Sequence, residues 1–186
     1  MQVAWAQLKQ TFPNLQTYGC VSHILNLLLK DIESLKSFSD HLGICKEIVK
    51  FFKLKHIPNA ILSKKQSGSF RTLKLPVATR WGSTVTCMES IQGNKQLLKE
   101  CLINPDIETL ATNKIKSTIL NDDVFWDRNV KFIELLIPVV HLITFMENTS
   151  ATLSDVRHKL YLLKEHFNTF VLKSPFLQNE EKLTTT

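Results

Sequence analysis

The amino-acid sequence predicts a mostly α-helical protein. Apolar residues recur at helical spacing along most of the 186 residues. Glycine and proline are scarce, at 5 and 6 residues, which argues against an all-β fold with many tight turns. Only one short segment, 15–21, has the composition of a strand. With 44% hydrophobic and 22% charged residues, the chain has the balance of a soluble globular domain.

The amino-terminal part is expected to hold three helices. The first covers residues 2–12, where Pro13 ends the helical pattern. The second, at 22–37, is expected to begin at Ser22, a residue type that is favoured at the N-cap. Leucine and isoleucine cover more than half of its circumference, so we expect it at the centre of the fold. The third, at 40–55, combines an apolar stripe with a lysine face.

The helical pattern stops at residues 56–78. This segment holds two prolines, one glycine and clustered polar residues, and it predicts a long basic loop. Helical periodicity resumes near residue 80, and Pro138 is expected to kink or split one of the later helices. The remaining helices are expected at 80–102, 107–120, 123–147 and 153–173. The apolar stripe of the last helix favours ordinary core packing, although a face for a protein partner is an alternative.

The positive charge is concentrated in one stretch. The chain carries a formal net charge of +6. Residues 46–80 hold nine lysines and arginines against one acid, Glu47, which gives +8 there and −2 elsewhere. A concentrated basic segment is typical of a surface that binds phosphate groups, and a solvated lysine-rich face is the alternative. The residues expected to contact nucleic acid are Lys46, Lys50, Lys53, Lys64, Lys65, Arg71, Lys74, Arg80 and Trp81.

The segment "GCVSHILNLLLKD" at 19–31 places Cys20 and His23 ahead of a leucine-rich helix. With His41 and Cys45, which lie one turn apart, they form the spacing C-x2-H-x17-H-x3-C that a zinc site tolerates. Three interpretations stay open for Cys20 and His23: core packing, half of a zinc site, or part of a family motif. Cys45 also belongs to an apolar stripe, where buried cysteines are common.

No motif of a known catalytic class stands out. The sequence contains no nucleophile elbow, phosphate loop or HExxH motif. Metal-dependent nuclease chemistry needs several carboxylates around divalent cations. No spacing singles out such a set among the candidate acids, and each is expected to be a helix cap or a surface acid: Asp31, Glu33, Asp122, Asp123, Asp127 and Glu147.

Arg80 and Trp81 are adjacent at the end of the basic stretch, in "LPVATRWGSTVTCMESI" at 75–91. Arginine can hold a phosphate with two hydrogen bonds, and an exposed tryptophan can stack on an unpaired base. The alternative is that Trp81 anchors its helix in the core.

The segments at 19–32 and 75–91, in this order and at this distance, resemble two motifs of the hAT superfamily of transposases. Their domesticated relatives, the zinc finger BED domain-containing proteins, are also similar. The first segment is similar to the Cys/Asp-x-x-His element, here Cys20 and His23. The second is similar to the Arg-Trp element, here Arg80 and Trp81. The region that starts at "FWDRNV" resembles the helical insertion of the family's catalytic domain.

This resemblance implies a fragment of an RNase H-like α/β domain with a helical insertion. Residues 1–102 would be a partial core that includes the basic loop at 56–78, residues 103–176 the insertion-like region, and residues 177–186 a disordered tail. It also implies that Trp81 lies near the old active-site cleft. The family's first acid would precede residue 1 and its third acid would follow the last residue, so no metal triad is expected here.

The function expected from these observations is a transposase-derived, catalytically inactive domain that binds DNA through a basic surface. A helical protein-interaction module in a nuclear context, without DNA binding, is the alternative. No cofactor is expected, although the ancestral site would hold a divalent metal such as Mg²⁺. A protein partner or a homo-oligomer fits both readings, whereas a small-molecule substrate does not. The most apolar segment, 135–146, is too short to span a bilayer. We therefore expect a soluble intracellular protein, located in the nucleus by resemblance.

Overall fold

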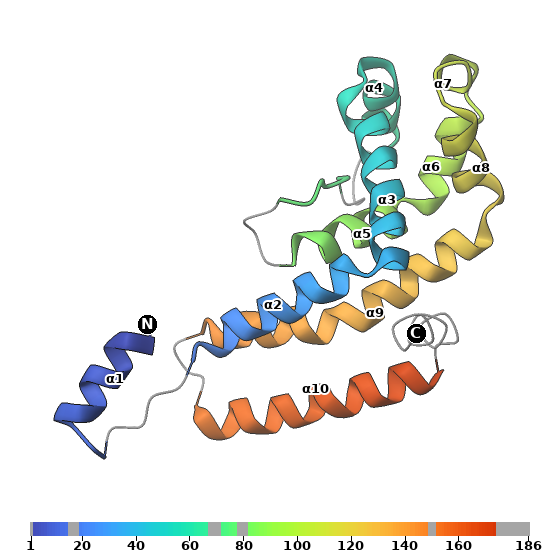
Figure 1. Cartoon of the computed structure of the whole chain (residues 1–186). Coiled ribbons are helices and arrows are strands. Elements are labelled where there is room, and N and C mark those ends of the chain that lie inside the picture. The colour runs from blue at the N-terminus through green and yellow to red at the C-terminus, as the bar shows by residue number, and fades with distance from the viewer. Residues whose placement is uncertain (1, 15–18, 67–71, 78–81, 149–151, 174–186) are drawn as a thin grey trace.

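Helices dominate the computed structural model, which describes residues 2–14, 19–66, 72–77, 82–148 and 152–173. Within these segments there is no strand, so the prediction of a mostly α-helical protein is confirmed. Of the predicted strand at 15–21, the described part contains no strand either, because Val21 already begins a helix. The helices are α1 (Gln2–Thr11), α2 (Val21–Ser34), α3 (Lys36–Leu54), α4 (His56–Lys65), α5 (Ser83–Gly93), α6 (Lys95–Leu102), α7 (Pro105–Glu108), α8 (Asn113–Asn121), α9 (Asp123–Met146) and α10 (Leu153–Lys173) (Figure 1).

The central helix is α9. It contacts α2, α3, α5 and α10, and in Figure 1 it runs beside α2 above α10. The helix begins where the Asp122 side chain accepts a hydrogen bond from the backbone N–H of Phe125 at 2.8 Å. Of the kink or split expected at Pro138, the split does not occur, because α9 runs unbroken from Asp123 to Met146. Buried neighbours on both sides, among them Leu136 and Val139, hold the helix across the one hydrogen bond that proline removes.

The leucine-rich helix α2 is not central, contrary to the prediction. Its buried residues are Ser22, Leu25 and Leu29, which lie on one side of the helix, and α2 contacts α9 and α3. Ile24 and Leu27 are 57% and 45% exposed, so part of its apolar surface faces outward. Its N-cap is Cys20, not the predicted Ser22. The apolar composition of a helix indicates how much surface it could bury, but not how many other helices pack against it.

Helix α4 corrects the prediction of a basic loop over residues 56–78. The first ten of these residues are helical. Pro58 is the third residue of α4, and a proline in the first turn gives up no hydrogen bond, because those N–H groups have no acceptor within the helix. Pro58 and Leu62 are buried, and α4 contacts α3, α6 and α7. Packing therefore supports a helix that the turn-forming composition obscured.

Helices α4, α6, α7 and α8 form a second group above the α2–α9–α10 layer in Figure 1. The single helix that was predicted for 80–102 is divided into α5 and α6 at Asn94. Asn94 is fully buried, and its side-chain amide donates to the carbonyl of Ser90 at 2.7 Å. Asn104 and Thr112 cap α7 and α8 through their side-chain oxygens.

One hydrophobic core connects these helices. It extends from Leu25 of α2 to Leu163 of α10, and it crosses residue 102 without interruption. The stripe of α10 contributes Leu163, together with the half-buried Phe167 and Phe170. The predicted core role of that stripe is therefore confirmed in part, since Leu160 of the same stripe is 36% exposed. The predicted tail at 177–186 lies outside the described residues.

By length and composition, α9 is also the one helix in the described segments that could cross a membrane. A core helix of a soluble protein meets the same criteria, and α9 packs against four other helices. Its first half also carries Asp127, Arg128 and Glu134. These observations agree with the predicted soluble protein.

Candidate nucleic-acid interface

The exposed side of α3 carries a row of lysines. Lys46, Lys50 and Lys53 lie on it at spacings of four and three, and all three are exposed. Lys53 donates from Nζ to the carbonyl oxygen of Leu73 at 3.3 Å, which places the segment 72–77 beside α3. The next residue, Lys74, is exposed as well. We call these four lysines the basic face.

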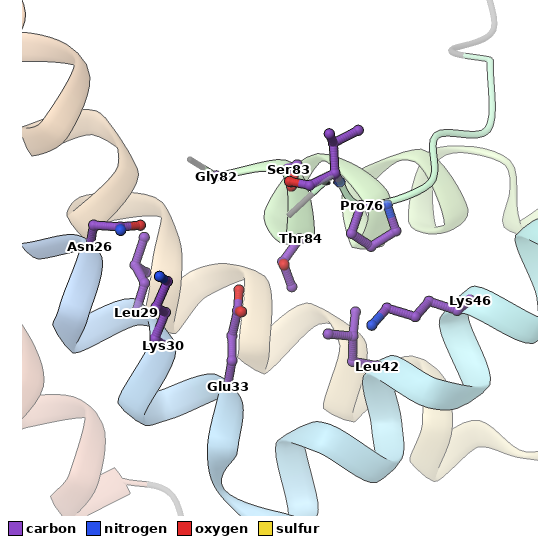
Figure 2. Close-up of a pocket in the computed structure, with 11 residues that line it drawn as sticks. Asn26, Leu29, Lys30, Glu33, Leu42, Lys46, Pro76, Gly82, Ser83 and Thr84 are labelled. Atoms are coloured by element: carbon purple, nitrogen blue, oxygen red, sulfur yellow. Dashed lines mark hydrogen bonds between the residues drawn. The ribbon is translucent and has the colours of Figure 1, made fainter. Parts of the chain in front are cut away.

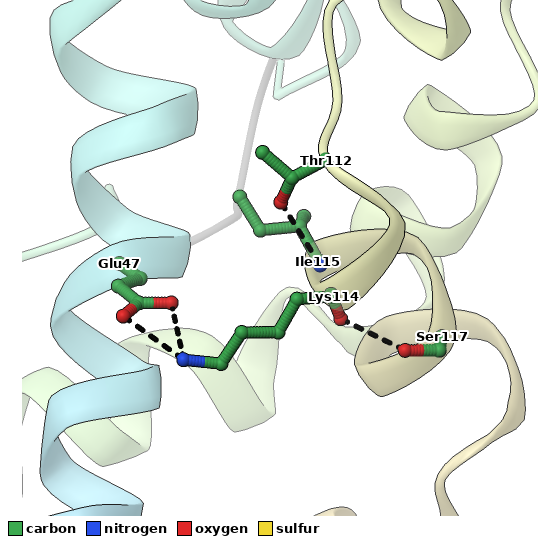
Figure 3. Close-up of polar contacts among 5 residues, drawn as sticks. All are labelled: Glu47, Thr112, Lys114, Ile115 and Ser117. Atoms are coloured by element: carbon green, nitrogen blue, oxygen red, sulfur yellow. Dashed lines mark hydrogen bonds and ion pairs between the residues drawn. The ribbon is translucent and has the colours of Figure 1, made fainter.

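The single acid of the basic stretch does not neutralise the basic face. Glu47 pairs with Lys114 of α8, and its two carboxylate oxygens lie 3.0 and 2.9 Å from Lys114 Nζ (Figure 3). Within the described segments no lysine of the basic face forms an ion pair. The charges of the basic face are therefore not neutralised by neighbouring carboxylates, and they remain available to an anion in solution.

The other predicted nucleic-acid contacts are not part of the basic face. Lys64 and Lys65 lie in the last turn of α4, where Lys65 pairs with Glu100 of α6 at 3.7 Å. Arg71, Arg80 and Trp81 lie outside the described residues. The predicted stacking role of Trp81 therefore stays a prediction.

A pocket of about 250 Å³ adjoins the basic face at the start of α5 (Figure 2). Lys46 contributes to it from α3, Lys30 and Glu33 from α2, and Thr84 from the first turn of α5. The sequence interpretation overlooked Lys30 and considered Glu33 only as a candidate metal-binding acid, because it treated their helix as buried on most sides. Their spacing of three residues, which places both on one face of a helix, was the available signal.

Gly82 shapes the edge of this pocket. It is the N-cap of α5 and has a φ of 70°, the left-handed region that favours glycine. A Cβ atom built on Gly82 would lie 2.7 Å from Cγ1 of Val140 on α9. The hydroxyl of Ser83 donates to the carbonyl oxygen of Val77 at 2.9 Å and accepts from its N–H at 3.0 Å. These contacts fix the segment 72–77 against the start of α5.

Replacement of Gly82 by alanine is expected to lower the free energy of unfolding by about 1–2 kcal/mol, because it adds backbone strain and the contact with Val140. Urea unfolding followed by circular dichroism measures this change. Gly93→Ala is the matched control, since it sits in a helix with no atom within 4 Å of the new Cβ. It should be neutral or stabilising by up to about 1 kcal/mol. Equal effects of the two variants would contradict this account.

The structure does not bring together the four residues whose spacing a zinc site would tolerate. Cys20 and His23 are exposed, whereas His41 and Cys45 are buried in the core. Burial raises the pKa of the Cys45 thiol well above its usual value, which disfavours the thiolate that zinc requires. In the described part of the chain no three His, Cys, Asp or Glu side chains gather around a common point. Cys45 thus follows the core-packing interpretation.

His41 and Cys45 instead meet a buried asparagine that the sequence interpretation missed. Asn129 of α9 is fully buried, and its amide donates to the carbonyl of Met88 and to the side chain of Gln92, both at 3.1 Å. Its oxygen therefore accepts, from Nε2–H of His41 at 3.1 Å and from the thiol of Cys45 at 3.7 Å. This polar node joins α3, α5 and α9 inside the core.

Burial lowers the pKa of His41 to about 4, because the imidazolium would lose its hydration. The hydrogen bond to Asn129 opposes this shift in part, and the charge of Arg128 adds to it. The ring also stacks on Phe125 with centroids 4.8 Å apart. His41 is therefore neutral at neutral pH and has a structural role.

The fold and the basic face together define a helical-bundle protein with a cationic surface that pairs with no carboxylate of the described segments. No protein-family model, no curated protein and no solved structure matches the chain.

Proposed function

We propose that the chain is a transposase-derived, catalytically inactive domain that binds DNA through its basic face. The observation that carries this proposal is the row Lys46, Lys50 and Lys53, which is exposed and free of ion pairs within the described segments. Phosphate contacts by such lysines dominate nonspecific binding to DNA. The binding would then depend strongly on salt and weakly on sequence.

The descent from a transposase is proposed from the sequence resemblance. One arrangement supports it: the two segments that carry the resemblance, 19–32 and 75–91, meet at the pocket beside α5. Asn26 and Lys30 come from the first segment, and Pro76 and Thr84 come from the second. The RNase H-like origin and the nuclear location are proposed from this same resemblance. The described segments contain no strand, so they do not themselves supply support for an RNase H-like sheet.

Alanine at Lys46, Lys50 and Lys53 together is expected to weaken DNA binding roughly tenfold or more at moderate salt, because each lysine that contacts a phosphate releases a counterion. The slope of log K against log salt should fall by about 0.9 for each such lysine. Fluorescence anisotropy with a labelled duplex of mixed sequence, at several salt concentrations, measures both quantities.

The matched control removes three exposed basic residues from helices that carry none of the basic face: Lys9 of α1, and Arg157 and Lys164 of α10. It changes the net charge equally and should leave the slope unchanged. Equal losses in both variants would show that only the net charge matters. Absence of DNA affinity at low ionic strength would contradict the proposal and favour the alternative, a helical protein-interaction module.

A further inference from the structure

The pocket beside α5 combines three features that favour an anion. Lys30 of α2 and Lys46 of α3 line it from two sides, and in Figure 2 both side chains extend toward the space below the start of α5. Neither lysine forms an ion pair within the described segments. The third feature is the amino-terminal end of α5, an 11-residue helix whose partial positive charge faces the same space.

The start of α5 has no internal cap. Gly82 supplies no side chain, and the helix has no side-chain hydrogen bond at its N-cap. Ser83 could have capped the helix instead, but its hydroxyl is hydrogen-bonded to the backbone of Val77. Within the described segments no side chain therefore caps the start of α5, and its first turn holds no acid, in contrast to α9, which Asp122 caps.

Thr84 provides an independent indication of a ligand. Thr84 is only 6% exposed, it lines the pocket, and its side chain forms no hydrogen bond with any residue of the described segments. Its hydroxyl oxygen is not sealed from the solvent, so it is left to hydrogen-bond with whatever enters the pocket. Figure 2 shows Thr84 directed into the space between α2 and α3, on the side from which Lys46 approaches.

Glu33 sets the chemistry of the remaining wall. Among the described residues it is the one acid that lines the pocket, and its carboxylate extends toward Thr84 (Figure 2). The positive charges of the two lysines and of the helix end outweigh the negative charge of Glu33, so the pocket favours a single anion. Repulsion by Glu33 weakens the binding of that anion. A volume of about 250 Å³ is several times the roughly 30 Å³ that one water molecule occupies in the liquid.

From this arrangement we propose that the pocket beside α5 is a phosphate-binding site. The phosphate oxygens accept from the Thr84 hydroxyl, the ammonium groups of Lys30 and Lys46, and the first-turn N–H groups of α5. Attribution of the phosphate to DNA rests on the proposed function. The site itself does not, because inorganic phosphate presents the same chemistry.

The test titrates the whole chain, labelled with nitrogen-15, with inorganic phosphate and follows the backbone amides by NMR. Shifts should concentrate at Thr84, Val85 and Lys30. Thr84→Val keeps the shape and removes the hydroxyl, so it should weaken phosphate binding about tenfold. Glu33→Gln removes the repulsive charge and should strengthen binding about two- to fivefold.

Asp31→Asn is the matched control for Glu33→Gln, because it removes the same charge from an exposed position of α2 that does not line the pocket. It should leave the phosphate affinity nearly unchanged. The inference is overturned if phosphate shifts scatter over all exposed lysines, if Thr84→Val has no effect, or if both acidic variants strengthen binding equally.

The source of the phosphate is distinguished with short oligonucleotides that carry a 5′-phosphate or a 5′-hydroxyl. Stronger shifts at Thr84 with the 5′-phosphate support a terminal phosphate, and equal shifts support an internal phosphodiester. Phosphate binding without any oligonucleotide binding keeps the site and contradicts the proposed DNA function. DNA binding without phosphate shifts at Thr84 contradicts the site and leaves the DNA function intact.

Discussion

Replacement of Asn129 by alanine is expected to lower the free energy of unfolding by about 3–4 kcal/mol. The change leaves the buried Nε2–H of His41 without an acceptor and opens a small cavity among α3, α5 and α9. It also removes the two hydrogen bonds that Asn129 donates toward α5. Urea unfolding at neutral pH, followed by circular dichroism, measures the loss.

The matched control for this experiment is Asn168→Ala. Asn168 is exposed on α10, and its side chain forms no hydrogen bond with the residues that the structure describes. Its replacement should change stability by no more than about 0.5 kcal/mol. A loss below about 1 kcal/mol for Asn129→Ala would mean that the node contributes little, and that apolar packing alone joins the three helices.

Acid is expected to destabilise the protein through His41. The pKa of this histidine is 6.5 in the unfolded chain and about 4 in the folded protein, so the unfolded chain binds the proton at the higher pH. The contribution of His41 is therefore complete above pH 6.5 and is lost as the pH falls toward 4. The shift corresponds to about 3 kcal/mol over this window.

His41→Gln isolates this effect, because glutamine can still donate to Asn129 but does not titrate. The stability of this variant should fall less steeply than that of the wild type between pH 6.5 and 4. His56→Gln, at an exposed position of α4, is the control and should follow the wild-type profile. Parallel profiles for all three proteins would exclude His41 as the acid-sensitive group, and NMR titration of its ring would confirm the assignment directly.

Helix existence could be predicted from the sequence, because apolar spacing records which face of a segment is buried. The stripe of α10 and the Asp122 cap of α9 are examples. The loop prediction for residues 56–65 failed because local composition suggested a break, while Pro58 and Leu62 gain burial against helices distant in the sequence. Tertiary packing outweighed local preference there.

The basic face could also be predicted in part. The spacing of Lys46, Lys50 and Lys53 places them on one side of any helix. Two features could not be predicted, because both depend on contacts between distant elements: the pairing of Glu47 with Lys114, and the approach of Lys30 to the start of α5. The Asn129 node was missed for the same reason, since a lone asparagine in an apolar helix gives no sign of its partners.

The distribution of the four thiols gives the protein a built-in chemical handle. Cys45, Cys87 and Cys101 are buried, and burial raises the pKa of each, to about 11 for Cys87. Cys20 alone is exposed, at the N-cap of α2, the helix that supplies Lys30 and Glu33 to the pocket. A maleimide fluorophore or spin label would therefore attach selectively to the native sequence, without cysteine engineering.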